Sequence, residues 1–454
     1  MLTCLTSRIN PFLLLLACAL PIQPAQAKTA PREIVEQVAT LIENNYFDQT
    51  QATAIADDLR NRARSGQFDS LKDPRDLATA VTTQLHPHDH HFRLTWSPSP
   101  SQAPGATNPG PEQSQAEWER RMGYGFRRVQ MLPGSLGYID LRLFADFSFL
   151  KPDEPPRQAA DAALALISTA DAVIIDLRNN GGGSPNMVGY LVSAFTPPDA
   201  NIYNTFKHRD SEGSERPKQF YPKPRLTVPL YILISGRTAS AAESTAYTLQ
   251  AAKRAVVVGE NSAGAANPGG EFPVGDGFDV FVSTSTAINP ITGTNWNFTG
   301  VKPDVPVDPD KALERAEILA LQAILAHAPD NNLETRWILE ALEAEAAPAP
   351  APGGAQLSDY AGTYSGDASI AIKHGALGLR RGQRPPWPLV RIHDDVFAVR
   401  DEPFRRVEFE RNPAGKITRF QLVRAGGPAA WFLKQPAQAT RRACASGSER
   451  CASP

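Results

Sequence analysis

Three short segments of the chain carry residue types that enzymes use for chemistry. The first, residues 176–183, places three consecutive glycines after a run of aliphatic residues. Glycines at such a place leave backbone N–H groups unobstructed, so they can bind a phosphate or a developing oxyanion. A phosphate loop would read G-x-x-x-x-G-K-S/T, a pattern that this segment lacks. The segment is therefore a candidate oxyanion site, with a flexible turn as the alternative.

The second segment, residues 235–243, reads S-G-R-T-A-S-A-A-E. It places Ser240 among small residues at a predicted strand-to-helix turn, where a nucleophile can be exposed at a helix N-terminus. The amide of Ala241 then faces the same place. The alternative is that Ser240 only caps the helix, which is the commonest reason for serine at this position.

The third segment, residues 86–91, reads H-P-H-D-H-H and holds four histidines. A serine nucleophile needs a base whose pKa lies near neutrality, and histidine is the usual one. Four histidines also suggest a metal site, but neither cysteine nor an H-E-x-x-H pattern accompanies them. From these residues alone, a solvated loop or adventitious metal binding stays open.

Strands and helices alternate between about residues 120 and 308. Unbroken aliphatic runs at 172–177, 230–234 and 255–258 are typical of parallel strands buried on both faces. Two of the three segments above follow such runs, and open α/β sheets bind ligands at strand ends. The pattern predicts an α/β core that carries the site.

The flanking regions predict a helical domain before this core and a small antiparallel β domain after it. The predicted organisation is a signal peptide (1–27), a helical domain (28–96), a linker (97–118), the α/β core (119–345), a second linker (346–356), a β domain (357–435) and a tail (436–454).

The composition is that of a globular protein, because 42% of the 454 residues are hydrophobic and 21% are charged. A formal net charge of −2 gives no reason to expect a nucleic-acid partner. The mature chain has no segment able to span a membrane.

The N-terminus predicts export. An apolar run at 12–20 precedes Ala25-Gln26-Ala27, which resembles a signal-peptide cleavage site. We therefore expect a periplasmic or secreted protein, with a lipoprotein anchored through Cys18 as the alternative. Cys444 and Cys451 then most simply form a local disulfide in the tail.

Together, these segments resemble the C-terminal-processing (tail-specific) serine peptidases, in the branch that includes the tricorn core and interphotoreceptor retinoid-binding-protein-like domains. The resemblance covers about residues 137–308, together with the helical domain and its histidine segment. It implies a crotonase-like α/β core. Four motifs occur in the family's order, namely D-L-R-N-N-G-G-G at 176–183, S-G-R-T-A-S-A-A-E at 235–243, V-V-G-E-N-S-A-G at 257–264 and G-V-K-P-D-V at 300–305.

The resemblance implies that Ser240 is the nucleophile and that amides of Gly182, Gly183 and Ala241 form the oxyanion hole. One branch of the family uses a lysine base after V-V-G-E. This chain has Gly264-Ala265-Ala266 there, which excludes a Ser–Lys dyad at that position.

The other branch takes a histidine from the N-terminal region, in a pattern like H-D-x-H before an apolar residue. Residues 88–92 fit, which makes His91 the general base and His90 the runner-up. The branch also has a glutamate in N-W-E-G, where this chain has Asn297. An amide can hold the imidazole tautomer but cannot stabilise imidazolium by charge, so Asp89 or Glu243 are alternative orienting groups.

The function implied is that of an exported serine peptidase that cleaves a peptide or protein substrate through an acyl-enzyme. No metal or organic cofactor is needed, and the sequence sets no oligomeric state. One alternative is a non-catalytic protein that binds apolar ligands or peptides on the same fold. Another is a crotonase-like enzyme acting on thioesters, in which Ser240 would have no evident role.

Overall fold

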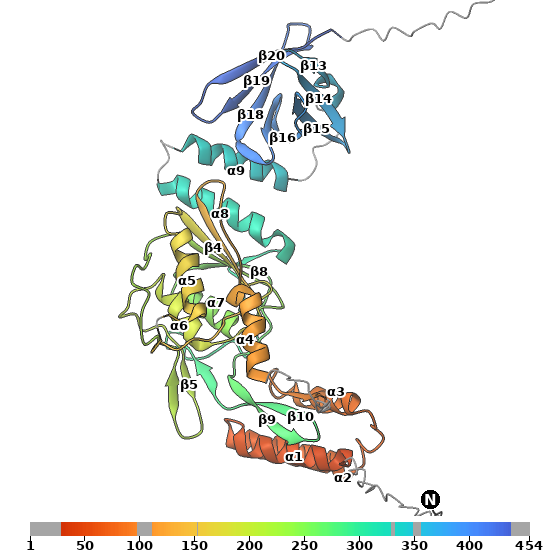
Figure 1. Ribbon diagram of the computed structural model, residues 1–454, viewed down its shortest axis with the longest axis vertical. Coiled ribbons are helices and arrows are strands. Elements are labelled where there is room, and N and C mark those ends of the chain that lie inside the picture. The colour runs from red at the N-terminus through yellow and green to blue at the C-terminus, as the bar shows by residue number, and fades with distance from the viewer. Residues whose placement is uncertain (1–28, 98–110, 152, 328–331, 348–355, 437–454) are drawn as a thin grey trace, which may run out of the picture.

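A computed structural model describes residues 29–97, 111–151, 153–327, 332–347 and 356–436. Figure 1 shows N-terminal helices, an α/β core and a C-terminal β domain following one another along the long axis of the molecule. The predicted signal peptide, Cys18, Cys444 and Cys451 lie outside the described residues. Within those ranges, no helix has the length and apolar character needed to cross a bilayer.

The core is built on a six-stranded sheet of order β12-β8-β7-β4-β3-β2. β2 and β3 form an antiparallel hairpin, and the other neighbours are parallel. Every residue of β3, β4 and β7 is buried, because helices cover both faces of the sheet. The strands are β2 (Phe126–Leu132), β3 (Leu136–Leu141), β4 (Ala172–Asp176), β7 (Leu230–Ile234), β8 (Val256–Gly259) and β12 (Val305–Pro306).

Alternate residues of each strand enter different helical layers. Val173 and Ile175 pack with α5, α6 and α7, whereas Ala172 and Ile174 pack with α8 and α9. The α/β core expected from the aliphatic runs is therefore confirmed. The helices are α5 (Pro155–Leu166), α6 (Pro185–Ser193), α7 (Ala241–Ala251), α8 (Ala312–His327) and α9 (Leu333–Ala346), and the short 3₁₀ turns are Gly123–Gly125, Pro309–Lys311 and Leu357–Asp359.

The N-terminal helices are joined to the core by a shared sheet. β1 pairs with β10, which pairs with β9 of the core, all antiparallel. Val280 and Val282 of β10 are buried among the three helices, so the helical segment and this hairpin share one hydrophobic cluster. The elements are α1 (Pro31–Asn45), α2 (Gln49–Arg64), α3 (Pro74–Leu85), β1 (Arg93–Trp96), β9 (Gly269–Gly275) and β10 (Phe278–Ser283).

Two further parts were not predicted as elements. The linker expected over 97–118 contains helix α4 (Pro111–Arg121), where Glu117 forms ion pairs with Arg120 and Arg121 one turn on. A small sheet of order β11-β5-β6 lies beside the core, and its strands are β5 (Thr205–Lys207), β6 (Glu212–Ser214) and β11 (Thr286–Ile288).

The C-terminal domain is one antiparallel sheet of eight strands in sequence order. It curls until its ends meet, where Ser365 N donates to Leu433 O (2.8 Å) and Gln435 N donates to Thr363 O (2.8 Å). Aromatic side chains fill its interior. The strands are β13 (Gly362–Tyr364), β14 (Ala368–Lys373), β15 (Ala376–Arg381), β16 (Trp387–His393), β17 (Val396–Val399), β18 (Glu402–Arg411), β19 (Ile417–Arg424) and β20 (Ala429–Leu433).

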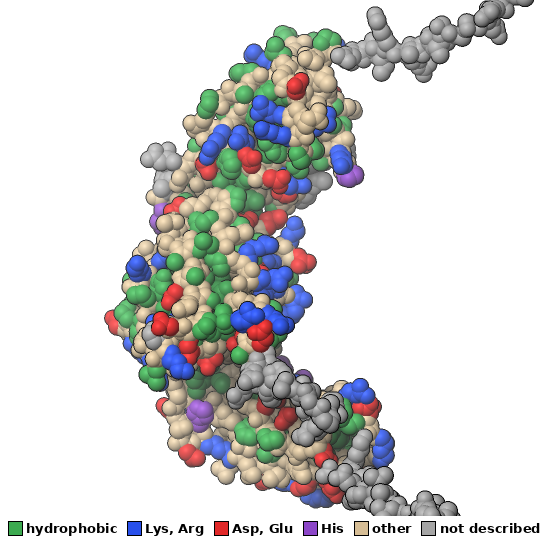
Figure 2. All heavy atoms as spheres, viewed as in Figure 1, with side chains coloured by type: hydrophobic (Ala, Val, Ile, Leu, Met, Phe, Trp, Pro, Cys, Tyr) green, Lys and Arg blue, Asp and Glu red, His purple; other side chains and the backbone are tan. Residues whose placement is uncertain are grey.

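The β domain contacts the core through α9. Arg406 of β18 lies over the ring of Trp337, 4.2 Å from its centroid, and forms an ion pair with Glu340. Figure 2 shows Lys and Arg side chains interspersed with Asp and Glu on the visible face of this domain, in keeping with the small net charge.

Phe420→Ala should unfold the β domain selectively. The Phe420 ring is fully buried and lies 4.7 Å from that of Phe432 and 4.8 Å from that of Tyr364, centroid to centroid. We expect this domain to lose about 3–5 kcal/mol of stability. Hydrogen exchange should speed up in β13–β20 and stay unchanged in β3, β4 and β7. Trp431→Ala, on the exposed face, is the control, and an equal effect of both variants would contradict this packing.

Candidate active site

Ser240 lies at the N-terminus of α7, directly after the turn that follows β7. Its backbone has φ +53° and ψ −119°, a conformation that non-glycine residues rarely adopt. Such strained strand-to-helix turns present a nucleophile above the sheet. The side chain is half-buried and lines a cavity.

The strained turn is held by Glu243, which is fully buried. Its carboxylate accepts hydrogen bonds from the Ser240 amide (2.8 Å), the Gly264 and Ala265 amides (2.6 and 2.9 Å) and Ser262 Oγ (2.5 Å). Burial raises the pKa of Glu243, and these four donors oppose the shift. Glu243 therefore ties the Ser240 turn to residues 262–265, and its oxygens are engaged there.

The glycine loop lies against Ser240. A Cβ on Gly182 would lie 2.8 Å from the Ser240 Cβ, and one on Gly183 would lie 2.2 Å from the Phe144 carbonyl oxygen. Both glycines have positive φ, +117° and +135°. Two hydrogen bonds join this loop to the serine turn, from Ala239 N to Asn180 O (3.0 Å) and from Thr238 Oγ1 to Leu177 O (2.8 Å).

The three amides expected in an oxyanion hole are not equivalent. Gly182 N donates to Asn180 Oδ1 at 2.8 Å, so that amide is engaged and the expectation for Gly182 is corrected. The amides of Gly183 and Ala241 have no acceptor among the described residues, and both residues line the cavity. Asn180, which sequence reasoning missed, thus shapes the loop while Gly183 and Ala241 keep free donors.

An ion pair supports the loop from below. Asp176 accepts hydrogen bonds from the Arg178 guanidinium (2.6 and 2.9 Å) and from Tyr138 Oη (2.7 Å). Burial favours a raised pKa for Asp176, but the Arg178 guanidinium outweighs it and holds the pKa below its usual value. The carboxylate stays charged and braces the start of the glycine loop.

His91 enters the same cavity from the N-terminal segment, just before β1. Its Nδ1 lies 3.4 Å from Asp89 Oδ1, and its ring stacks on Phe281 with centroids 5.8 Å apart. Both ring nitrogens are buried, and neither has a hydrogen-bond partner among the described residues. Catalytic hydrogen bonds are often long in the absence of substrate, and buried polar atoms without partners occur at functional sites.

Asp89 is the carboxylate beside this ring. It is fully buried and accepts hydrogen bonds from the His91 amide (2.9 Å) and from Asn267 Nδ2 (2.8 Å). Burial favours a raised pKa for Asp89, but bonds from His91 and Asn267 outweigh it and lower the pKa below its usual value. Asn267 belongs to the core and was missed by sequence reasoning, because no motif marks it.

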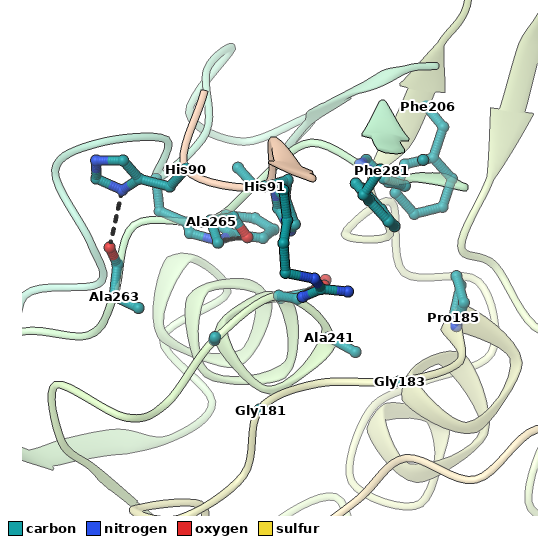
Figure 3. Close-up of a pocket in the computed structure, with 18 of the residues that line it drawn as sticks. His90, His91, Gly181, Gly183, Pro185, Phe206, Ala241, Ala263, Ala265 and Phe281 are labelled. Atoms are coloured by element: carbon teal, nitrogen blue, oxygen red, sulfur yellow. Dashed lines mark hydrogen bonds between the residues drawn. The ribbon is translucent and has the colours of Figure 1, made fainter. Parts of the chain in front are cut away.

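Two other predicted residues, His90 and Asn297, differ in their relation to the cavity, because His90 lines it and Asn297 does not. His90 is exposed, and its Nδ1 lies 3.3 Å from the Ala263 carbonyl oxygen, as the dashed line in Figure 3 marks. Asn297 accepts a hydrogen bond from Ala266 N at 3.4 Å and is absent from the described lining of the cavity. Among the described residues, no three His, Cys, Asp or Glu side chains gather to hold a metal ion.

The cavity has a volume of about 760 Å³ and is lined from both the N-terminal segment and the core. In Figure 3, His91 is drawn above the loop that carries Gly181 and Gly183, and Ala241 lies beside that loop. The Ser240 hydroxyl, the His91 ring and the free amides of Gly183 and Ala241 thus line one cavity, with Asp89 beside His91. These are the groups that acyl transfer uses.

Comparison with known proteins agrees with this geometry, because residues 135–307 match the family described as peptidase family S41. The matched region lies within the α/β core. It contains Ser240, Glu243 and both loops of the site, whereas His91 and Asp89 precede it in the chain.

Proteins similar to this chain over less than half of its length carry names of processing enzymes. The C-terminal processing peptidase of Tetradesmus obliquus is 28% identical over 188 residues, covering 38% of this chain and 36% of that protein. The carboxyl-terminal-processing protease of Synechocystis is 29% identical over 177 residues, or 39% of each. The chain thus spans little more than a third of these relatives. A solved photosystem II D1 C-terminal processing protease aligns at 15% identity with a TM-score of 0.38, over 62% of this chain and 94% of that one.

Gly182→Ala should displace Ser240, because the added Cβ meets the Ser240 Cβ and the backbone keeps a positive φ. We expect the rate at which a fluorophosphonate labels Ser240 to fall about 10²-fold. Gly181→Ala is the matched control, since a Cβ there meets nothing within 4 Å. Equal labelling rates in the two variants would show that the loop does not set the position of Ser240.

Proposed function

We propose that this chain is an exported serine peptidase that cleaves peptide bonds through an acyl-enzyme on Ser240, on a core of crotonase-like type. The observation that carries the proposal is that a strained Ser240 and His91 line one cavity, with the buried Asp89 beside His91. The S41 family match supports the reaction class. Export rests on the sequence of residues 1–27.

In the proposed reaction, Ser240 Oγ attacks the carbonyl carbon of the peptide while His91 Nε2 takes the hydroxyl proton. The amides of Gly183 and Ala241 donate to the oxyanion, an interaction worth about 2.7–4 kcal/mol per donor in a comparable site. His91 then gives its proton to the leaving amine as the C–N bond breaks. Water, activated by the same imidazole, hydrolyses the ester and restores Ser240.

Asp89 is the proposed orienting group. A carboxylate beside Nδ1 fixes the tautomer that leaves Nε2 free to accept a proton, and it stabilises the imidazolium that forms. The hydrogen bonding of Asp89 fits this role, because Asn267 of the core donates to Oδ2, the carboxylate oxygen farther from the His91 ring contact. With Asp89 in this role, an asparagine instead of a glutamate at position 297 does not deprive the site of its negative charge.

Removing the nucleophile or the base tests the proposal directly. We expect Ser240→Ala to abolish fluorophosphonate labelling and His91→Ala to slow it about 10³-fold or more. His90→Ala, which removes the neighbouring exposed ring, should keep near-normal labelling. If the folded wild-type chain is not labelled at all, the proposal fails and a binding protein on the same fold takes its place.

Asp89→Asn and Asn297→Ala separate the two orienting residues. We expect Asp89→Asn to lower kcat about 10⁴-fold, because the amide favours the wrong tautomer, whereas Asn297→Ala should keep most activity. Since the pKa of Asp89 is lowered, its carboxylate stays charged at neutral pH, and its contribution to stability is lost only as pH falls through that lowered value. Peptide hydrolysis at pH 7 is the measurement. The opposite ranking would assign the role to Asn297.

A further inference from the structure

One acidic side chain lies in the cavity without a role in the chemistry above. Glu215 follows β6 and is the sole Asp or Glu in the cavity's described lining. Its side chain is buried, and its amide donates to Asn204 O at 3.0 Å. The carboxylate accepts hydrogen bonds from Ser244 Oγ (2.6 Å) and Asn204 Nδ2 (2.8 Å).

All of these donors are neutral. The adjacent Arg216 turns away, donating to Ala200 O and Pro198 O while stacking over Phe220. Arg93, which also lines the cavity, pairs with Glu271 at 2.8 Å. Burial raises the pKa of Glu215 to about 7. A buried carboxylate without a cationic partner is costly, so a cation from a ligand would be strongly favoured there.

Glu215 lies in the same cavity as Ser240, where the scissile bond of a bound peptide would be. Its partner Ser244 lies one helical turn beyond Ser240 on α7, and both serines line the cavity. Phe206, Pro185 and Phe281 also line it and are labelled in Figure 3. Apolar walls leading to a buried acid fit a long aliphatic stem that ends in a positive charge.

We propose that Glu215 selects substrates by binding the cationic side chain of a Lys or Arg residue next to the scissile bond. This inference rests on the peptidase function proposed above, and it adds the class of residue that the cavity takes. The stem packs against the apolar walls, and the ammonium or guanidinium forms a charge-assisted hydrogen bond with the carboxylate.

The experiment is cleavage of a proteome-derived peptide library by the full chain, with cut sites read by mass spectrometry. We expect Lys and Arg to be enriched at one of the two positions flanking the cut. Matched peptides with Lys or norleucine at that position then give kcat/KM values, and we expect Lys to be preferred about 30-fold or more.

Glu215→Gln should abolish this preference by lowering kcat/KM for the Lys peptide while leaving the norleucine peptide unchanged. The amide keeps the shape of the side chain and can still bond to Ser244 and Asn204. Glu212→Gln removes an exposed carboxylate from the same hairpin and is the matched control. It should keep the wild-type preference.

The outcomes separate this inference from the proposed function. Cleavage without enrichment of basic residues, or a Lys preference that persists in Glu215→Gln, overturns the role of Glu215 and leaves the peptidase intact. No cleavage by a folded chain whose Ser240 resists fluorophosphonate overturns the peptidase, and the role of Glu215 with it.

Discussion

The site depends on one buried carboxylate. Asp89 receives a hydrogen bond from the His91 amide on its own segment and another from Asn267 of the core, 178 residues away. Because its side chain is fully buried, losing either donor would leave the charge with fewer hydrogen bonds and no water to replace them. Asp89, which lies beside His91, therefore also joins the N-terminal segment to the core, and β1–β10 pairing and the shared hydrophobic cluster reinforce this connection.

The nucleophile side is rigid for a related reason. A positive φ at Ser240 persists only where the surroundings over-determine it, and Glu243 provides this through four hydrogen bonds that join the Ser240 turn to residues 262–265. The glycine loop packs so closely on Ser240 that a Cβ at Gly182 has no room. Both loops are thereby positioned before any substrate binds, which is the arrangement that electrostatic catalysis requires.

The structure brings the residues that stand in local motifs together around one cavity. Ser240, the glycine loop and His91 each stand in a short pattern whose residue types have a direct chemical reason. The hydrogen bond from Gly182 N to Asn180 Oδ1 spans two residues and is of the kind that Asn favours in turns, so the motif contained that signal.

The remaining parts depend on contacts that are distant in sequence. Asn267 becomes a site residue only because β1 pairs with the β9–β10 hairpin, and no local pattern indicates that pairing. No sequence motif marks Glu215, and its proposed role follows from its buried position beside α7. The α/β core was predictable because strands buried on both faces give continuous aliphatic runs, whereas α4 was missed within a segment rich in Pro, Ser and Gln.

The central claim is that Asp89 holds His91 for proton transfer with Ser240. Proton NMR of the ¹⁵N-histidine-labelled chain tests it most directly, because an Nδ1–H bonded to a buried carboxylate resonates at low field. The account predicts one such signal from His91 that shifts when Ser240 is phosphonylated, disappears in Asp89→Asn and persists in Asn297→Ala. A signal that persists in Asp89→Asn, or whose chemical shift does not change when Ser240 is phosphonylated, would contradict the proposed role of Asp89.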